Sequence, residues 1–528
     1  MQSHKDQVNP VLEGIEMAEE HYGRAPLVEA LQQYQVKKDA SFHVPGHKNG
    51  QALRGHAKGI EELARVMEID VTEITGTDDL HHPEGVIREA QQLAAAQFGA
   101  EETFFLVGGS TAGNLALILS VCTAPGDVLL VQRNVHKSVI HGLMLAGAHA
   151  VFLAPQLDAG SGLATIPSEA TVREALRRYP GAKGVLLTHP SYYGMGAPLQ
   201  PLAELCHAHG VPLLIDEAHG AHFGQHPALP ESALAAGADG VVQSTHKMLT
   251  ALTMGAMLHV QGGLLDRTLL RQRLAMLQSS SPSYPIMASL DLSRSLLGAQ
   301  GPAFFEGGLA AAAHMRRGLA KQSRFGVVKP PGASGEAAAY TIQDPLKLVI
   351  FDASAALSGY ELQERLEAEG CVPEMSDDRF VVLALGPGTT MEDADRLLQA
   401  LDHIANAEAD SLEKTVRGGL VSPTGSADEL STWNNSVHGG HLSEVSGPVP
   451  FSLTPLIPGE IEAIPVEESL GRQAAEMIIP YPPGIPLLYP GEIITETVRQ
   501  RLRLLRDSGA KCQGPADPRL HTIQVKKG

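Results

Sequence analysis

Short apolar runs alternate with helical patterns along the middle of the chain, from about residue 100 to residue 260. Runs rich in Val, Ile, Leu and Phe predict strands, and stretches whose apolar residues recur every three or four positions predict helices between them. The predicted strands are Thr103–Val107, Val128–Val131, Ala150–Leu153, Gly184–Leu187, Pro212–Ile215 and Gly240–Gln243, and two of the predicted helices are Pro167–Arg178 and Leu199–His209. This alternation is typical of parallel strands joined by crossover helices, so it predicts an α/β fold with a mostly parallel sheet.

A second region begins near Gly301 and has a different pattern. Its predicted elements are helices at Leu309–Lys321, Gly359–Glu369 and Met391–Asn406 and strands at Leu346–Phe351 and Phe380–Leu385. They predict a smaller α+β carboxyl-terminal domain. Residues 411–450, rich in Gly, Ser, Asn and His, lack periodicity and are expected to form a surface insertion. We therefore divide the chain into an amino-terminal segment (1–25), a major domain (26–300) and a carboxyl-terminal domain (301–528).

The charge balance narrows the choice of partners. The 528 residues include 40 Lys and Arg against 59 Asp and Glu, a formal net charge of -19. Such an excess of negative charge disfavours binding to nucleic-acid backbones or anionic lipids. No charged residue lies between Glu102 and Asp127, but glycines and polar residues interrupt that stretch. A loop that enters a buried helix therefore explains it better than a membrane span, and neither nucleic acid nor a membrane is an expected partner.

Cysteine and histidine usage bears on compartment and metal binding. The four cysteines, at positions 122, 206, 371 and 512, are too few and too scattered for a disulfide framework or a thiolate metal site. This distribution favours a reducing compartment, so we expect a cytoplasmic protein. The 23 histidines include close pairs, but no Cys or carboxylate with metal-ligand spacing accompanies them. No metal is expected.

The segment Val107–Asn114, Val-Gly-Gly-Ser-Thr-Ala-Gly-Asn, ends the first predicted strand. Its glycines let the backbone turn closely, and a helix is expected to begin near Ala112. The free N–H groups of a helix start, with the hydroxyls of Ser110 and Thr111, favour a bound phosphate. An ordinary turn whose Ser or Thr caps the helix explains the same residues, and the lysine of a P-loop is missing. The segment alone leaves both interpretations open.

Two further predicted strands end near groups of opposite charge. Pro212–Ile215 is followed by Asp216, and Gly240–Gln243 is followed shortly by Lys247. The carboxyl ends of parallel strands meet at one edge of a sheet, which is where chemistry is expected. A lysine desolvated among apolar residues has a lowered pKa and becomes an amine able to form an imine. Taken singly, Asp216 is also explained as a helix cap, and Lys247 as a solvated surface charge.

A phosphate cradle, an acid and a lysine, in this order on one sheet, match the requirements of pyridoxal 5'-phosphate (PLP). The helix start would hold the phosphate, Asp216 would keep the pyridine nitrogen protonated, and Lys247 would hold the aldehyde as an imine. His136 lies just past the strand that begins at Val128 and would stack on the ring. Without the other signals, His136 would be interpreted as part of a polar surface turn.

Seven short segments of the chain carry a resemblance to a known family. They are Phe42–Lys48, Asp78–Leu80, Arg133–Ser138, Asp216–His219, Ser244–Lys247, Tyr481–Pro486 and Tyr489–Glu492. With these segments the chain resembles the ornithine/lysine/arginine decarboxylases, most of all the shorter bacterial branch of that family. The resemblance runs from about Arg24 to Arg499 and implies an aspartate-aminotransferase-like major domain, the fold type I of PLP enzymes. Residues 411–450 are foreign to it.

The resemblance implies roles for individual residues. Those expected to hold PLP are Ser110, Thr111, His136, Asp216, His219, Ser244, His246 and Lys247. Lys247 would form the imine, His136 would stack on the ring, and His219 would lie near the ring oxygen or the imine. These three residues are the expected catalytic groups.

The resemblance also implies a substrate and a partner subunit. Glu374 and Asp377 match the acidic segment of the family, and Glu374 would contact the distal ammonium or guanidinium of a basic amino acid. Arginine is the preferred substrate, with lysine and ornithine as alternatives. The loop 278–284 is similar to one that reaches the neighbouring active site in a homodimer or larger homo-oligomer. Without the resemblance it is a Ser-rich loop, and the acids are solvated turn residues.

Other functions stay open at this point. Asp216–His219 is also similar to the acyl-condensing synthases, and aminotransferases share the same layout. Arg133–Ser138 and the Pro-rich carboxyl-terminal segment favour the decarboxylases over both. A PLP-binding regulatory protein without catalysis is a third alternative, which the presence of Lys247 disfavours.

Overall fold

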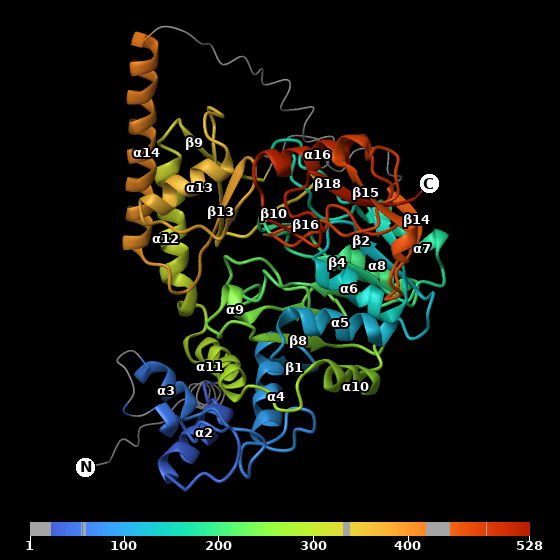
Figure 1. The fold of residues 1–528 in the computed structure, drawn as a ribbon. Coiled ribbons are helices and arrows are strands. Elements are labelled where there is room, and N and C mark those ends of the chain that lie inside the picture. The colour runs from blue at the N-terminus through green and yellow to red at the C-terminus, as the bar shows by residue number, and fades with distance from the viewer. Residues whose placement is uncertain are drawn as a thin grey trace, which may run out of the picture.

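The computed structural model describes residues 23–527 except for residues 54, 56–59, 331–337, 419–443 and 482. Its centre is an eight-stranded sheet with the strand order β1-β8-β7-β6-β4-β2-β3-β14 (Figure 1). The strands are β1 (Glu102–Leu106), β2 (Val128–Gln132), β3 (His149–Leu153), β4 (Val185–Thr188), β6 (Leu213–Asp216), β7 (Gly240–Gln243), β8 (Ala256–Val260) and β14 (Val445–Pro450).

Strands β3, β2, β4, β6 and β7 pair in parallel, which confirms the predicted α/β fold with a mostly parallel sheet. Strand β8 runs antiparallel to both of its neighbours, β7 and β1. Because the direction reverses twice, β1 points the same way as β7. The carboxyl ends of six strands, β1, β2, β3, β4, β6 and β7, therefore meet at one edge of the sheet.

Helices cover both faces of this sheet. They are α4 (Val86–Phe98), α5 (Gly109–Val121), α6 (Lys137–Ala146), α7 (Glu169–Arg178), α8 (Gln200–Ala208), α10 (Arg267–Leu277) and α11 (Tyr284–Gln300). Successive strand residues point to opposite faces. Leu130 of β2 thus packs in one apolar core, and its neighbours Leu129 and Val131 pack in the other. In the described part of the chain, no helix is long and apolar enough to cross a membrane.

The rest of the chain builds two smaller parts beside the sheet edge (Figure 1). In one, the four-stranded sheet β12-β13-β11-β9 packs with α12 and α14, and in the other short strands pair beneath α16. The bounds in the first part are β9 (Phe325–Val327), β11 (Lys347–Asp352), β12 (Met375–Ser376), β13 (Phe380–Ala384), α12 (Ala303–Leu319), α13 (Gly359–Ala368) and α14 (Met391–Gly418). Those in the second are β15 (Ile461–Pro465), β16 (Ile479–Pro480), β17 (Cys512–Gln513), β18 (Thr522–Lys526) and α16 (Glu496–Asp507). Strands β5 (Met195–Gly196) and β10 (Ile342–Gln343) pair the major domain with the first part.

The prediction of an irregular insertion at residues 411–450 was wrong at both ends of that range. Helix α14 continues to Gly418, and residues 407–414 are mostly good helix formers. At the other end, β14 joins the large sheet beside β3, with a register shift between Val445 and Pro448. An edge strand tolerates prolines, so the strand forms where the sequence gives no strand signal. Residues 419–443 lie outside the described residues.

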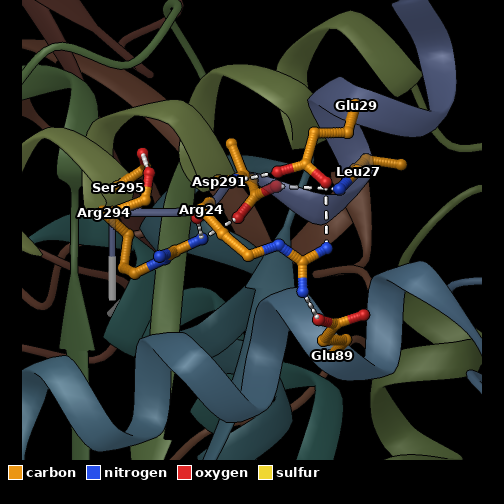
Figure 2. Close-up of polar contacts among 9 residues, drawn as sticks. Arg24, Leu27, Glu29, Glu89, Asp291, Arg294 and Ser295 are labelled. Atoms are coloured by element: carbon orange, nitrogen blue, oxygen red, sulfur yellow. Dashed lines mark hydrogen bonds and ion pairs between the residues drawn. The ribbon is translucent and has the colours of Figure 1, made fainter. Parts of the chain in front are cut away.

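A buried ion pair anchors the start of the described chain (Figure 2). Asp291 and Arg294 of α11 form an ion pair with each other, and both side chains are fully buried. Asp291 accepts the backbone N–H of Leu27 at 2.9 Å, and Arg294 donates to the carbonyl of Arg24 at 2.6 Å. Arg24 in turn pairs with Glu89 of α4 at 2.9 Å. These contacts hold α2 (Pro26–Lys37) against α4 and α11, while α3 (Glu61–Met67) follows nearby in the chain.

Candidate active site

A pocket opens where the strands of the large sheet end. Loops after β2, β4, β6 and β7 line it, together with residues from both smaller parts. The residues expected from the sequence that line it are Ser110, His136, Asp216, His219, Lys247 and Asp377. Four other expected residues do not belong to its lining: Thr111, Ser244, His246 and Glu374, of which Glu374 bonds Tyr192 in the lining. The carboxyl ends of the strands therefore bring together groups that are far apart in the sequence.

Asp216 is the last residue of β6, and its carboxylate is buried. Asn114 of α5 donates to one carboxylate oxygen at 2.8 Å, and the backbone N–H of Ala218 donates to the other at 3.2 Å. Burial raises the pKa of Asp216, and the positive charge of Lys247 opposes that rise. The carboxylate is thus held in place and faces a cation.

His136 belongs to the same hydrogen-bond network. Asn114 also donates to the hydroxyl of Ser138 at 3.1 Å, and that hydroxyl lies 2.9 Å from Nδ1 of His136. The same ring nitrogen accepts the backbone N–H of Ser138 and so caps α6. Burial, with the charge of Lys247, lowers the pKa of His136 to about 4. The imidazole is therefore neutral near pH 7 and fixed beside the pocket.

Lys247 lies in the short helix α9 (Thr245–Met248), which directly follows β7. Its side chain remains accessible from the pocket, although protein atoms crowd around it. This desolvation lowers the pKa of Lys247, while the charges of Asp216 and Glu374 oppose the change. Nζ of Lys247 lies 3.0 Å from Nε2 of His219. The amine is thus reactive by its environment and has a histidine as its direct neighbour.

The surroundings of α5 and α9 fit the phosphate of PLP. In the described part of the chain, no side chain caps the first turn of α5, and the buried hydroxyl of Ser244 has no hydrogen-bond partner. Both are donors that an anion would satisfy. Ser110 faces the pocket, whereas Thr111 is exposed and His246 bonds the carbonyl of Gly255 at 3.0 Å. Ser110 and Ser244 therefore fit the predicted role more directly than Thr111 or His246.

The far side of the pocket carries carboxylates from the smaller sheet. Tyr193 donates to Asp377 at 2.6 Å, and Tyr192 donates to Glu374. Burial, with the charge of Asp378, raises the pKa of Asp377 to about 6. Asp378 itself pairs with Arg501 at 2.9 Å. Arg379 also lines this end, so two acids, Asp377 and Asp378, stand here beside two bases, Arg379 and Arg501.

The carboxyl-terminal part closes the pocket through contacts with the segment Arg133–Ser138. Arg133 forms an ion pair with Glu492 at 3.0 Å and donates to the carbonyls of Pro486 and Leu487, each at 3.1 Å. Gly484, with φ at +89°, approaches His136 so closely that a Cβ there would lie 2.9 Å from Nε2. Because of these contacts, the segment Arg133–Ser138 and the carboxyl-terminal segments with Gly484 and Glu492 meet at the pocket although they are far apart in the sequence.

Several residues of this site were not predicted from the sequence. Thr188 ends β4, and Tyr192 and Tyr193 follow it, so the rule that placed Asp216 at the end of β6 could have found them. Asn114 lies within the segment considered as a phosphate cradle, but nothing in the sequence pairs it with Asp216. Arg501 lies on an amphipathic helix with no sequence signal for the pocket. Among the described residues, no group of His, Cys, Asp and Glu is suited to hold a metal ion.

The large sheet with a strand-edge site and smaller accompanying domains defines a fold type I enzyme. The chain belongs to the Orn/Lys/Arg decarboxylase family. The model of the Orn/Lys/Arg decarboxylase major domain matches residues 25–393, and that of the Orn/Lys/Arg decarboxylase C-terminal domain matches residues 452–519. The resemblance noted in the sequence is thereby confirmed, and the protein is an enzyme of the carboxy-lyase class.

Relatives of known name support this assignment. The chain is 35% identical to an arginine decarboxylase of Bacillus subtilis, over 95% of this chain and 98% of that protein. It is 42% identical to the uncharacterized protein YaaO of the same organism, over 93% and 96%. The solved lysine decarboxylase LdcF of Francisella novicida has 22% identity and a TM-score of 0.77, over 96% of this chain and 81% of that one. This last likeness concerns the fold.

Proposed function

We propose that the protein is a PLP-dependent decarboxylase that converts a basic amino acid, arginine in preference to lysine or ornithine, into the corresponding amine and CO2. The observation that carries this proposal is one pocket with Lys247 and Asp216 at the sheet edge and acids at the far side. The arginine preference draws on relatives named arginine decarboxylase at about 35% identity. We expect a cytoplasmic enzyme, given the scattered cysteines.

PLP, when bound, supplies an electron sink for the pair that remains at Cα as CO2 departs. The start of α5 and Ser244 would hold the phosphate, and Asp216 would keep the pyridine nitrogen protonated. His136 would lie against the ring. Lys247 and His219, 3.0 Å apart, are the groups positioned to deliver the proton that Cα requires.

The acids of the smaller sheet would orient the substrate. Arg501 pairs with Asp378, which leaves Glu374 and Asp377 to face a distal cation. A planar guanidinium is recognised best by paired carboxylate oxygens, whereas an ammonium needs only a nearby negative charge. The tyrosines that bond Glu374 and Asp377 would hold these carboxylates in fixed orientations.

We expect arginine, lysine or ornithine to release CO2 when the purified protein is supplied with PLP, with the highest kcat/KM for arginine. Lys247→Ala should abolish both the product and the visible absorbance of the bound cofactor, because Lys247 is the one lysine in the pocket lining among the residues that the structure describes. Lys183→Ala, on the exposed surface, is the matched control. Turnover that depends on an added α-keto acid or acyl-CoA would instead identify an aminotransferase or a synthase.

Glu374→Gln should raise KM for arginine by about 10- to 100-fold, because a hydrogen bond to a charged group contributes about 1.5–3 kcal/mol. Steady-state kinetics of CO2 release measures this change. Glu364→Gln, on the exposed side of α13, is the control and should behave as the wild type. An unchanged KM in Glu374→Gln would remove this residue from the substrate site.

We also propose a homodimer or larger homo-oligomer in which the loop 278–284 approaches a neighbouring active site. Both ends of this loop bond within the chain: Gln278 accepts the N–H of Val107 at 2.8 Å, and Tyr284 donates to the carbonyl of Asp78. Ser279–Ser281 are exposed and would form the contact. Light scattering coupled to size exclusion should give at least twice the chain mass of 55.9 kDa, and a pure monomer would contradict the proposal.

A further inference from the structure

A second lysine lies behind His219 and has no role in the chemistry described so far. Lys347 begins β11, and only 2% of it is exposed. Its Nζ lies 3.2 Å from Nδ1 of His219, and the other ring nitrogen of His219 lies 3.0 Å from Nζ of Lys247. The imidazole therefore lies between two lysine amines, one in the pocket and one behind it.

The hydrogen bonds of this triad limit how many protons it holds. Burial lowers the pKa of His219 well below its usual value, and a neighbouring lysine charge lowers it further, so the ring is neutral. A neutral imidazole has one nitrogen that donates and one that accepts. Two ammonium groups would both need an acceptor. When both hydrogen bonds are made, the lysine that faces the ring N–H is therefore a neutral amine, and only the other lysine can be an ammonium.

Imine formation requires Lys247 as the neutral amine, so Lys347 is the lysine left to be the ammonium. The groups that face it are His219, Lys247, the carboxylates of Asp344 and Glu374, and the ring of Tyr192, whose centroid lies 5.5 Å from Nζ. Arg316 donates to the backbone carbonyl of Lys347 and not to its amine. Burial lowers the pKa of Lys347 to about 8, and the two carboxylates oppose that change. Near pH 7 Lys347 keeps its proton.

We propose that Lys347 is a positioning residue that orients His219 and stores a proton for Lys247. This inference rests on the proposed role of Lys247. As an ammonium, Lys347 donates to Nδ1 of His219, which leaves the ring proton on Nε2 and directed at Lys247. Decarboxylation consumes one proton at Cα, and this store supplies it from behind the pocket.

The transfer balances in protons and charge. An N–H bond of Lys347 breaks as one forms at Nδ1 of His219, and the Nε2–H bond breaks as one forms at Nζ of Lys247. The positive charge moves from Lys347 to Lys247, the ring stays neutral in its other tautomer, and no electrons change hands. Solvent then restores the starting state after product leaves.

The orienting role is tested on His219 itself, in the full chain with and without PLP. Deuterium exchange at C2 of His219, followed by mass spectrometry, proceeds through the protonated ring and so reports its pKa. Lys347→Met removes a nearby positive charge and should raise the rate at pH 7 about tenfold, equivalent to about one pKa unit. Lys347→Arg keeps the charge and should match the wild type, as should the exposed control Lys183→Met. An unchanged rate in Lys347→Met would overturn the orienting role.

The storage role is tested by kinetics with arginine. Arginine side chains do not release their proton in proteins, so Lys347→Arg keeps the charge but cannot supply a proton to His219. Both Lys347→Met and Lys347→Arg should lower kcat by about 100-fold with little change in KM, because Lys347 is buried behind His219. Full kcat in Lys347→Arg would overturn storage.

The pH dependence of kcat is a third test of Lys347. Wild-type kcat should fall as pH rises through about 8, because Lys347 then loses the stored proton, and Lys347→Met should lack this decline. If Lys347→Met does not fold, Lys347→Gln serves in its place, since it keeps a donor without a charge. Should the wild type decarboxylate no basic amino acid, the proposed function fails, yet exchange at His219 still decides the orienting role.

Discussion

A buried acid and a partly desolvated amine at one edge of the sheet, Asp216 and Lys247, are the constraint on which the rest of the site depends. They follow adjacent parallel strands, β6 and β7, so the pairing of the sheet itself brings them close. Burial raises the pKa of Asp216 and lowers the pKa of Lys247, and each charge offsets part of the other's desolvation. Asn114, Ser138 and His136 extend this arrangement into a connected polar network beside the pocket.

The remaining parts of the chain complete what the sheet edge begins. The four-stranded sheet brings acids to the far side of the pocket and brings Lys347 behind His219. The carboxyl-terminal part is joined to the strand loops by Arg133 and Glu492 and by the close approach of Gly484 to His136. The pocket therefore exists only when distant segments of the chain fold together, which accounts for motifs spread over most of its length.

Local patterns in the sequence predicted six of the eight strands of the major sheet to within a residue or two, because buried strands are short apolar runs, but they did not predict β8. The same rule placed Asp216 and Lys247 at one edge. It did not find β14, whose prolines hide an edge strand, nor the continuation of α14 to Gly418. Lys347 was not predicted as a site residue, because it lies in an apolar run and its position behind His219 depends on how two domains pack. Arg501 was missed for the same reason.

The central claim is that Lys247, and no other amine, forms the covalent link with PLP. Treating the holoenzyme with borohydride fixes that link, and mass spectrometry of the digested protein then identifies the modified residue. The account predicts the cofactor mass on the peptide that contains Lys247 and an unmodified Lys347. Cofactor mass on Lys347, or on a lysine outside the pocket, would contradict it.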